Sequence, residues 1–478
     1  MKFLKIVSLA IVCCCFFAES KGTTANAYDI TVDIHNYNDS IIFLAKYYGD
    51  KQYIQDTIKR NANGLFEIKG AEPLDAGVYI IATADKRYFE VVIDKEQFFS
   101  ITTDNNDFIG TIKFKGSSEN NDYYDYLHFI NPRGMKLDSL SKAIKLAETK
   151  DDSIKIAQTI KSISEEIDAY KDSFVKNHPD ALQTSIFNAL KDIKFPEVPI
   201  LPNGRKDSTF TYLYYKAHFW DNFNFGDDRL VRTPIFASKL KQYLDNLTVQ
   251  DPDSINKEAD FLVNATRKAP ELFKYTVFYL TYNYETSKIM GMDAVFVHMA
   301  TTYYTHPKDI FWLDSVAIKK IVDRGFQLQP LLLGKKAPNL VFRDLNNQPV
   351  SLYSVDAPYT VLYFWSYDCG HCKTETPILA DTMKKWSQLG VHMFAVQTEY
   401  NLDTTKSTIN RMGIGMWQNV HDMYNETNFR HVYDIYSTPV IYLLDKNKNI
   451  LAKRITVDQL DMILNKYIIE KEKSPFSE

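Results

Sequence analysis

The sequence has little of what marks extended, membrane-embedded or nucleic-acid-binding proteins. Glycine and proline number 17 each in 478 residues, too few for collagen-like or low-complexity segments. The 56 lysines and arginines face 60 aspartates and glutamates, so the basic footprint of a nucleic-acid-binding protein is missing. Beyond the N-terminal segment there is no second hydrophobic span. What remains is a globular chain whose length corresponds to about three domains.

Cysteine is scarce, with five residues, and three of these are Cys13, Cys14 and Cys15. They lie in an apolar stretch, residues 6–18, which follows two lysines and resembles the core of a secretory signal. The stretch is too short to span a bilayer. Signal cleavage after Ser20 or after Ala27 removes all three cysteines, whereas a lipoprotein would keep one of them as a lipid anchor. We therefore expect a periplasmic protein, with a lipoprotein on a membrane surface as the open alternative.

The mature chain keeps two cysteines, Cys369 and Cys372. A bridge between residues three positions apart closes almost no loop, so it contributes little to stability. A zinc site would need a second cysteine pair, and none remains after cleavage. The histidines show no metal-ligand spacing, so we expect neither a metal nor a cofactor. The pair is therefore a candidate redox-active disulfide.

The periodicity of the hydrophobic residues changes twice along the chain and predicts three domains. Residues 28–117 contain short β-rich runs between turn residues, which indicate an antiparallel β-sandwich. Residues 118–330 follow a helical period, as in the apolar stripe from Ile156 to Phe174, and predict an all-α domain. Residues 331–478 alternate strand and helix patterns in the order of the thioredoxin fold. Strands are expected over 340–343, 359–365, 391–397, 440–444 and 450–454, with helices from 370, over 404–412 and from 458.

The expected strand that ends at Trp365 leads directly into the Cys-x-x-Cys motif, and a helix begins at the motif. Cys369 then lies at a helix N-terminus, where unpaired N–H groups and the helix dipole lower a thiol pKa. Cys369 is therefore the predicted nucleophile, and Cys372, one turn further on, is the predicted resolving cysteine. His371 lies between them and is either a positive charge near the sulfur or a solvated helix residue.

Thr438 and Pro439 open an apolar strand further along the chain. Together with Trp365 before the cysteine motif and the β/α order, they make residues 331 to about 472 resemble the thioredoxin superfamily. The resemblance implies a cis bond before Pro439, opposite the cysteines. It also implies that the backbone of Thr438, with Trp365 nearby, binds an incoming peptide. An ordinary trans proline at the start of a strand is the alternative.

The segment 337–339, the long stretch before Pro439 and Glu375 look most like the secreted TlpA/ResA branch of that superfamily. This resemblance implies that Glu375 lies beneath the active site and influences the cysteine pKa values. A half-buried carboxylate there can relay a thiol proton, whereas a surface salt bridge is the alternative. Tyr363 stands where plain thioredoxin has a buried aspartate, so Glu375 is the better relay candidate.

The two upstream regions resemble an architecture of secreted proteins from Bacteroidetes-type bacteria, whose upstream domains have no known function. A peroxidase would carry proline and threonine where Leu362 and Ser366 stand, so that activity is not expected. A polar cluster in the helical domain is interpreted as a salt-bridged loop and not as a site. Its members are His218, Asp221, Asp227, Asp228, Arg229 and Arg232.

These observations predict an extracytoplasmic thiol-disulfide oxidoreductase that acts on client proteins and exchanges electrons with a membrane redox partner. The dipeptide between the cysteines resembles that of protein disulfide isomerases, whose potential differs from that of thioredoxin by roughly 90 mV. Glu375 and Thr438 favour reduction or isomerisation instead. A reductase or isomerase is the prediction. A disulfide-forming oxidase, and a binding or assembly protein that uses the thioredoxin domain as a clamp, remain as alternatives.

Overall fold

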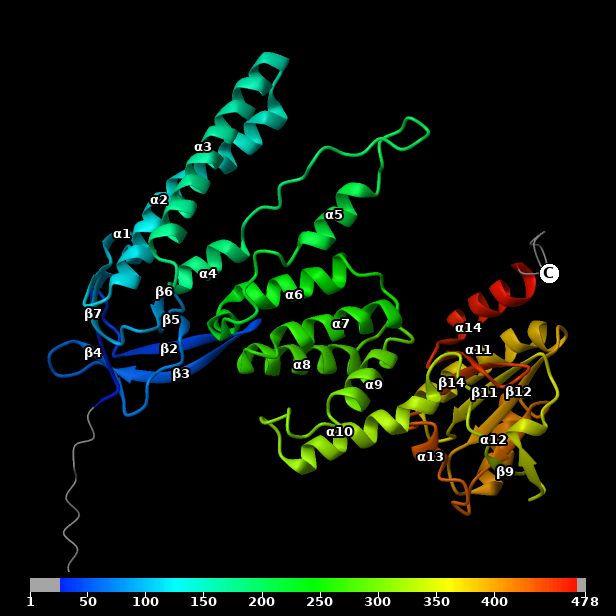
Figure 1. Ribbon diagram of the computed structural model, residues 1–478. Coiled ribbons are helices and arrows are strands. Elements are labelled where there is room, and N and C mark those ends of the chain that lie inside the picture. Colours follow the sequence, from blue (N-terminus) through cyan, green and yellow to red (C-terminus); the bar gives the residue numbers. More distant parts are fainter. Residues whose placement is uncertain (1–25, 471–478) are drawn as a thin grey trace, which may run out of the picture. The chain divides into compact units, whose positions relative to one another are not determined.

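A computed structural model describes residues 26–470 (Figure 1). These residues form two compact units. The first unit contains the chain up to Asp192 with the stretches Trp220–Phe223 and Arg229–Ala237, and the second contains the rest from Ile193. The expected signal segment with Cys13, Cys14 and Cys15 lies outside the described residues. Within 26–470, no helix is both long enough and apolar enough to cross a membrane.

The first unit begins with two four-stranded sheets that enclose a common core. Residues alternate along the strands, so that Ile30, Val32 and Ile34 of the first strand all point into this core. One pairing differs from the expected antiparallel sandwich, because β1 and β7 are parallel. The strands between them form a crossover long enough to permit this pairing. In sheet order the strands are β4 (Phe66–Gly70), β1 (Tyr28–His35), β7 (Phe98–Asp104) and β8 (Lys113–Lys115), then β3 (Lys51–Lys59), β2 (Ile41–Tyr48), β5 (Gly77–Thr83) and β6 (Tyr88–Ile93).

The central region is helical, as its periodicity predicts. The apolar stripe lies on α3, where Ile163, Ile167 and Phe174 are buried. Asp251 and Asp314 cap the helices that follow them by accepting a backbone N–H, which fixes where those helices begin. The helices are α1 (Phe108–Thr111), α2 (Ser118–Ala143), α3 (Lys150–Asn177), α4 (Leu182–Ala189), α5 (Phe210–His218), α6 (Pro234–Asn246), α7 (Pro252–Thr266), α8 (Pro270–Glu285), α9 (Asp293–Thr302) and α10 (Ser315–Leu328).

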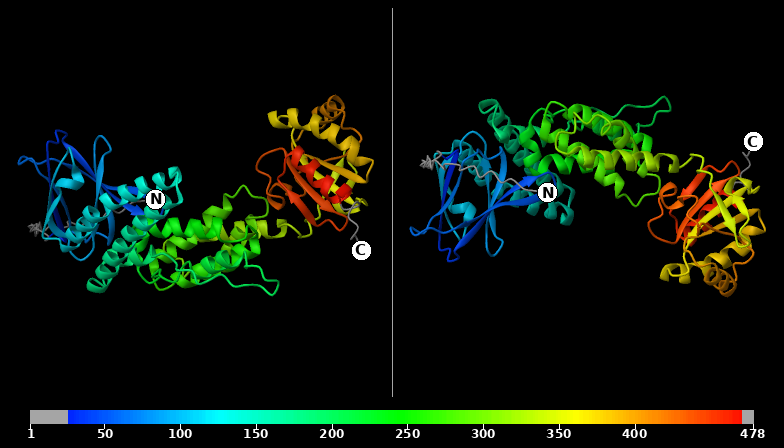
Figure 2. Two further views of the ribbon diagram at one scale, coloured as in Figure 1. Left: turned by 90° about the horizontal axis from the view of Figure 1, so that it is seen from above. Right: turned by 90° about the horizontal axis from the view of Figure 1, so that it is seen from below.

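The C-terminal domain, coloured yellow to red in Figure 2, is a single seven-stranded sheet with helices packed against it. Its three central strands are parallel, and the outer strands pair antiparallel. In sheet order the strands are β10 (Pro349–Ser351), β9 (Val341–Asp344), β13 (Gln418–His421), β12 (Val391–Gln397), β11 (Tyr359–Trp365), β14 (Val440–Asp445) and β15 (Ile450–Lys453). The helices are α11 (Gly370–Ser387), α12 (Leu402–Met412), α13 (Phe429–Val432) and α14 (Val457–Leu464).

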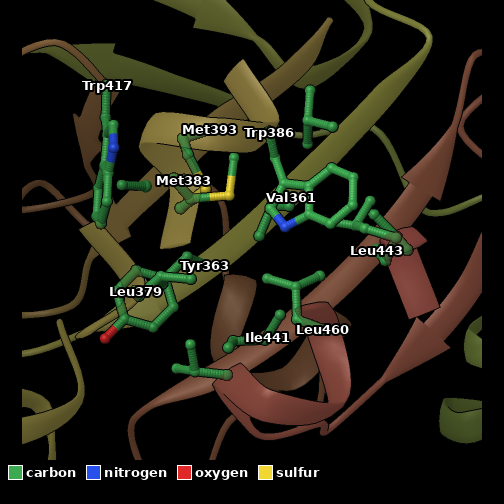
Figure 3. Packing of buried hydrophobic residues seen from close by; sticks show 14 of the residues in the cluster. Val361, Tyr363, Leu379, Met383, Trp386, Met393, Trp417, Ile441, Leu443 and Leu460 are labelled. Carbon is green, nitrogen blue, oxygen red and sulfur yellow. The ribbon is translucent and has the colours of Figure 1, made fainter. Parts of the chain in front are cut away.

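The core on one face of this sheet holds α11 in place. Side chains alternate along β11, so Val361 and Tyr363 face α11 and α14, whereas Leu362 packs on the opposite side. Trp386 of α11 is fully buried in the same cluster (Figure 3). It donates its indole N–H to Asp461 of α14 at 2.7 Å. Burying each such side chain contributes about 1.5–3 kcal/mol. The start of α11 is therefore fixed at the end of β11.

Candidate active site

Cys369 is the N-cap residue of α11. Its sulfur accepts a hydrogen bond from the backbone N–H of Cys372 at 3.1 Å. The first N–H groups of a helix have no partners within the helix, so the sulfur satisfies one of them. Both cysteines are free thiols, and Cys369 is half-buried whereas Cys372 is fully buried. Only the first sulfur is accessible to another molecule.

The surroundings of the two thiols give them different pKa values. Burial by itself would raise the pKa of Cys369, but hydrogen bonds from Cys372 and Thr438 and from the backbone outweigh it. The pKa of Cys369 is therefore lowered. At Cys372 burial dominates and raises the pKa to about 12. Because the thiolate is the nucleophile, this difference favours attack by Cys369.

Thr438 and Pro439 lie directly beside Cys369. The Cys369 thiol donates a hydrogen bond to the carbonyl oxygen of Thr438 at 3.1 Å, and the Thr438–Pro439 peptide bond is cis, as predicted. Both residues are partly exposed, and β14 begins at the next residue and pairs with β11. The exposed edge formed by Thr438 is therefore next to the accessible sulfur.

A pair of hydroxyl groups lies in the core close to the cysteines. Tyr363 is buried, and its hydroxyl is 2.8 Å from Oγ1 of Thr376. Burial raises the pKa of Tyr363, and the charges of Cys372, Cys369 and Glu375 add to the effect, although the Thr376 hydrogen bond opposes it. The structure thus places Tyr363 near the cysteine pair, and Glu375, which is half-buried, near Tyr363.

Thr376 is absent from the residues that the sequence singled out, although its position carried a usable signal. It follows Cys372 by four residues, so both lie on the same face of α11. Tyr363 drew attention only as the replacement for a buried aspartate.

Two other residues were expected in the site, His371 and Trp365, and one is exposed whereas the other is buried. His371 is exposed, and within residues 26–470 its imidazole makes no hydrogen bond to either cysteine. Its backbone N–H nevertheless helps to lower the pKa of Cys369. Trp365 was expected to contact a client. The structure corrects this expectation, because Trp365 is fully buried and can only support the motif from within the core.

Comparison with known proteins agrees with this geometry. The AhpC/TSA family matches residues 333–453. Curated relatives named thiol-disulfide oxidoreductase ResA come from Bacillus anthracis, 24% identical over 141 residues, and Bacillus subtilis, 24% identical over 135 residues. These alignments cover 29% and 28% of this chain and 80% and 73% of the respective relatives. The C-terminal domain belongs to the thioredoxin-like AhpC/TSA family.

Two solved structures are similar to parts of this chain. A domain of a possible thiol-disulfide isomerase from Cytophaga hutchinsonii is 46% identical, with 30% of this chain and 99% of that chain covered and a TM-score of 0.29. A thioredoxin-like protein from Bacteroides caccae is 20% identical, with 58% and 100% covered and a TM-score of 0.45.

The regions before the thioredoxin-like domain match two families described as domains of unknown function, over residues 28–123 (DUF4369) and 148–324 (DUF5106). In the helical region, Arg229 and Arg232 of the polar cluster form ion pairs with Asp94 and Asp75. Asp228 accepts the first backbone N–H groups of α8. These contacts agree with the interpretation of a salt-bridged loop. In the described part of the chain, no three His, Cys, Asp or Glu side chains are arranged to hold a metal ion.

Proposed function

We propose that the protein is an extracytoplasmic thiol-disulfide oxidoreductase that reduces or isomerises disulfides in client proteins. The observation that carries the proposal is the position of Cys369. Its sulfur caps a helix, has a lowered pKa and lies against the carbonyl of Thr438 at a partly exposed edge. A client backbone bound along this edge would present its disulfide to the sulfur.

The proposed reaction has two steps. The Cys369 thiolate attacks one sulfur of a client disulfide, so that a mixed disulfide forms and the other client sulfur leaves as a thiolate. Cys372 then loses its proton and attacks Cys369, which releases the second client sulfur and leaves a Cys369–Cys372 disulfide. The client gains two electrons and two protons, and the cysteine pair loses them. We assign Glu375 as the acceptor of the Cys372 proton, because it is half-buried and because Glu375 and Cys372 both act electrostatically on Tyr363.

The direction of electron flow depends on two opposing effects. A stabilised Cys369 thiolate favours the reduced pair, which makes the pair a better oxidant. A half-buried carboxylate at Glu375 opposes a second negative charge and makes the pair more reducing. With Thr438 favouring the same direction by family resemblance, we propose a pair kept reduced by a membrane redox partner on the periplasmic side.

A trapping experiment tests the site. In the Cys372→Ser variant the second step is blocked, so mixed disulfides between Cys369 and client proteins should accumulate. The Cys369→Ser variant is the matched control, because it keeps one thiol in the same motif but should trap few clients. Similar trapping by both variants would contradict the assignment of the nucleophile.

A second measurement tests the direction. Rapid acid quenching of growing cells, followed by alkylation of free thiols, reports the redox state of the cysteine pair. We expect most molecules to carry two alkylated cysteines. A mostly oxidised pair in cells would overturn the reductase or isomerase and favour an oxidase.

A further inference from the structure

The second unit contains a cavity of about 640 Å³ that is lined by the helical region and by the thioredoxin-like domain. One wall belongs to the helical region and includes residues 286–291 of the connection between α8 and α9 (residues 286–292). The opposite wall belongs to the thioredoxin-like domain and includes Tyr436, Ile455 and Met462. The volume is within the range of about 300–1,000 Å³ that is usual for binding pockets.

The rim of the cavity is apolar and solvent-exposed. Ile289 and Met290 of the helical wall are 57% and 42% exposed, and Tyr436 and Met462 of the opposite wall are 74% and 71% exposed. Large exposed apolar side chains that gather around a hollow mark a contact surface. Methionine adapts its shape to different apolar partners, which suits a surface that accepts more than one sequence.

The charged groups in the cavity are largely neutralised by one another. The carboxylate of Asp434 accepts hydrogen bonds from Arg324 and Arg454, and the Lys453 ammonium is paired with Asp293. Because two arginines share Asp434, these three cations and two carboxylates leave one positive charge in excess. An occupant with an apolar side chain would contact the exposed apolar rim.

The helical wall is held against the thioredoxin-like domain. The sulfur of Met290 accepts the backbone N–H of Lys453 at 3.5 Å. Gly291 has a φ of +91°, and a Cβ atom there would lie 2.9 Å from Leu333. The wall is therefore preformed, which lowers the entropic cost of binding.

One residue of the cavity lining, Tyr436, lies near Thr438. It precedes Thr438 by two residues, so the two Cα atoms are at most about 7 Å apart. An extended client segment along Thr438 would therefore carry side chains a few residues from its cysteine into the cavity.

We propose that this cavity binds an extended client segment that has a large apolar side chain two to four residues from the attacked cysteine. Residues 286–292 of the helical region thereby select clients for the cysteine pair. This inference rests on the proposed function and adds the recognition surface to it.

The test compares two peptides with the full-length reduced protein. Each peptide has an internal disulfide, and they differ only in leucine or aspartate three residues before the first cysteine. The Ile289→Asp and Met462→Asp variants should lower kcat/KM for the leucine peptide about tenfold, through KM, as loss of one central contact commonly does. Reduction of bis(2-hydroxyethyl) disulfide, which is too small to reach the cavity, should not change. Val316→Asp is the control, because Val316 is 62% exposed on α10 and lies outside the cavity.

A binding measurement separates this inference from the proposed function. The leucine peptide with serines in place of its cysteines should bind the unmodified protein, and Ile289→Asp should raise the Kd about tenfold. Discrimination in binding without any reduction would reject the proposed function and keep the cavity as a peptide site. Equal losses on the peptide and the small disulfide, or no loss, would overturn the inference. So would a dimer of this chain that Ile289→Asp dissociates.

Discussion

The cysteine pair and residues 286–292 both lie near the loop that precedes Pro439 in the second unit. The sequence specifies the positions of these two regions in different ways. The pair is local, since one strand end and one helix start place both sulfurs. Residues 286–292 carry no motif and acquire a role only because Met290 and Gly291 contact a distant part of the chain. The comparison indicates that the proposed chemistry lies within one domain, whereas the proposed recognition surface combines two. Substitutions in one should therefore leave the other intact.

The Cys369→Ser variant should separate the chemistry from the recognition most clearly. This variant should lose at least about a thousandfold of the exchange activity, because the attacking sulfur is gone. The loss should be equal for a small disulfide and for a protein client, unlike the selective loss expected for Ile289→Asp. Thiol release from both substrates measures it. Residual activity on one substrate only would break the proposed division between chemistry and recognition.

A smaller effect on the chemistry is expected from Glu375→Gln. The amide cannot accept the Cys372 proton, so release of the mixed disulfide should slow by about a hundredfold, the usual size of a proton-transfer contribution. Stopped-flow measurement of the second step, with thermal unfolding to confirm the fold, tests the prediction. Asp381→Asn is the matched control, since Asp381 is an exposed carboxylate on the same helix. A Glu375→Gln protein as fast as its parent would reject the relay.

The two thiols themselves should differ in reactivity. The pKa of Cys369 is lowered from 9.0 whereas that of Cys372 is about 12, so the thiolate fractions at neutral pH differ by at least three orders of magnitude. Nucleophilicity falls with pKa and offsets about half of this on a logarithmic scale, so Cys369 should be alkylated about thirtyfold faster. Its rate should rise with pH and level off below pH 9, because the thiolate accumulates above its pKa. Mass spectrometry after iodoacetamide treatment resolves the two sites, and equal rates would count against the assignment.

The sequence predicted the central part of the thioredoxin-like domain well for a physical reason. Parallel strands buried on both faces are continuous apolar runs, so the ranges expected for β11 and β12 agree with the structure. Strands without that signature were missed. β13 contains Gln418, Asn419 and His421, and β3 is almost wholly exposed, so neither has an apolar pattern. Their places are set by neighbouring strands, which a single sequence does not display.

The residues of the site likewise differ in how well the sequence predicts them. The cysteines and Pro439 stand in recognisable local patterns, whereas the cavity combines the α8–α9 connection, α10, the loop before Pro439 and α14. No periodicity links segments so far apart in the chain. Trp365 shows that sequence prediction has a limit even within the motif. Its spacing from the cysteines predicted that it lies near them, but not that its side chain is completely buried.

The smallest expected effect concerns the contact that joins the helical region to the active-site loop. Asp434 lies four residues before Thr438, its side chain is 2% exposed, and it accepts hydrogen bonds from Arg324 of α10 and from Arg454. Asp434→Asn keeps the side-chain shape and tolerates the positive φ of this residue, so it removes the charge and little else.

Because both guanidinium groups are partly exposed, water replaces some of the lost interaction, and we expect a loss of about 1–2 kcal/mol in the stability of the second unit. Thermal unfolding measures this loss. Glu426→Gln is the control, since it removes the charge from an exposed pair with Arg343. If Asp434 holds the cavity wall in place, the leucine peptide should lose a few-fold in kcat/KM while the small disulfide is reduced at the original rate. A loss of stability without any change in peptide preference would show that this contact stabilises the fold but does not shape the recognition surface.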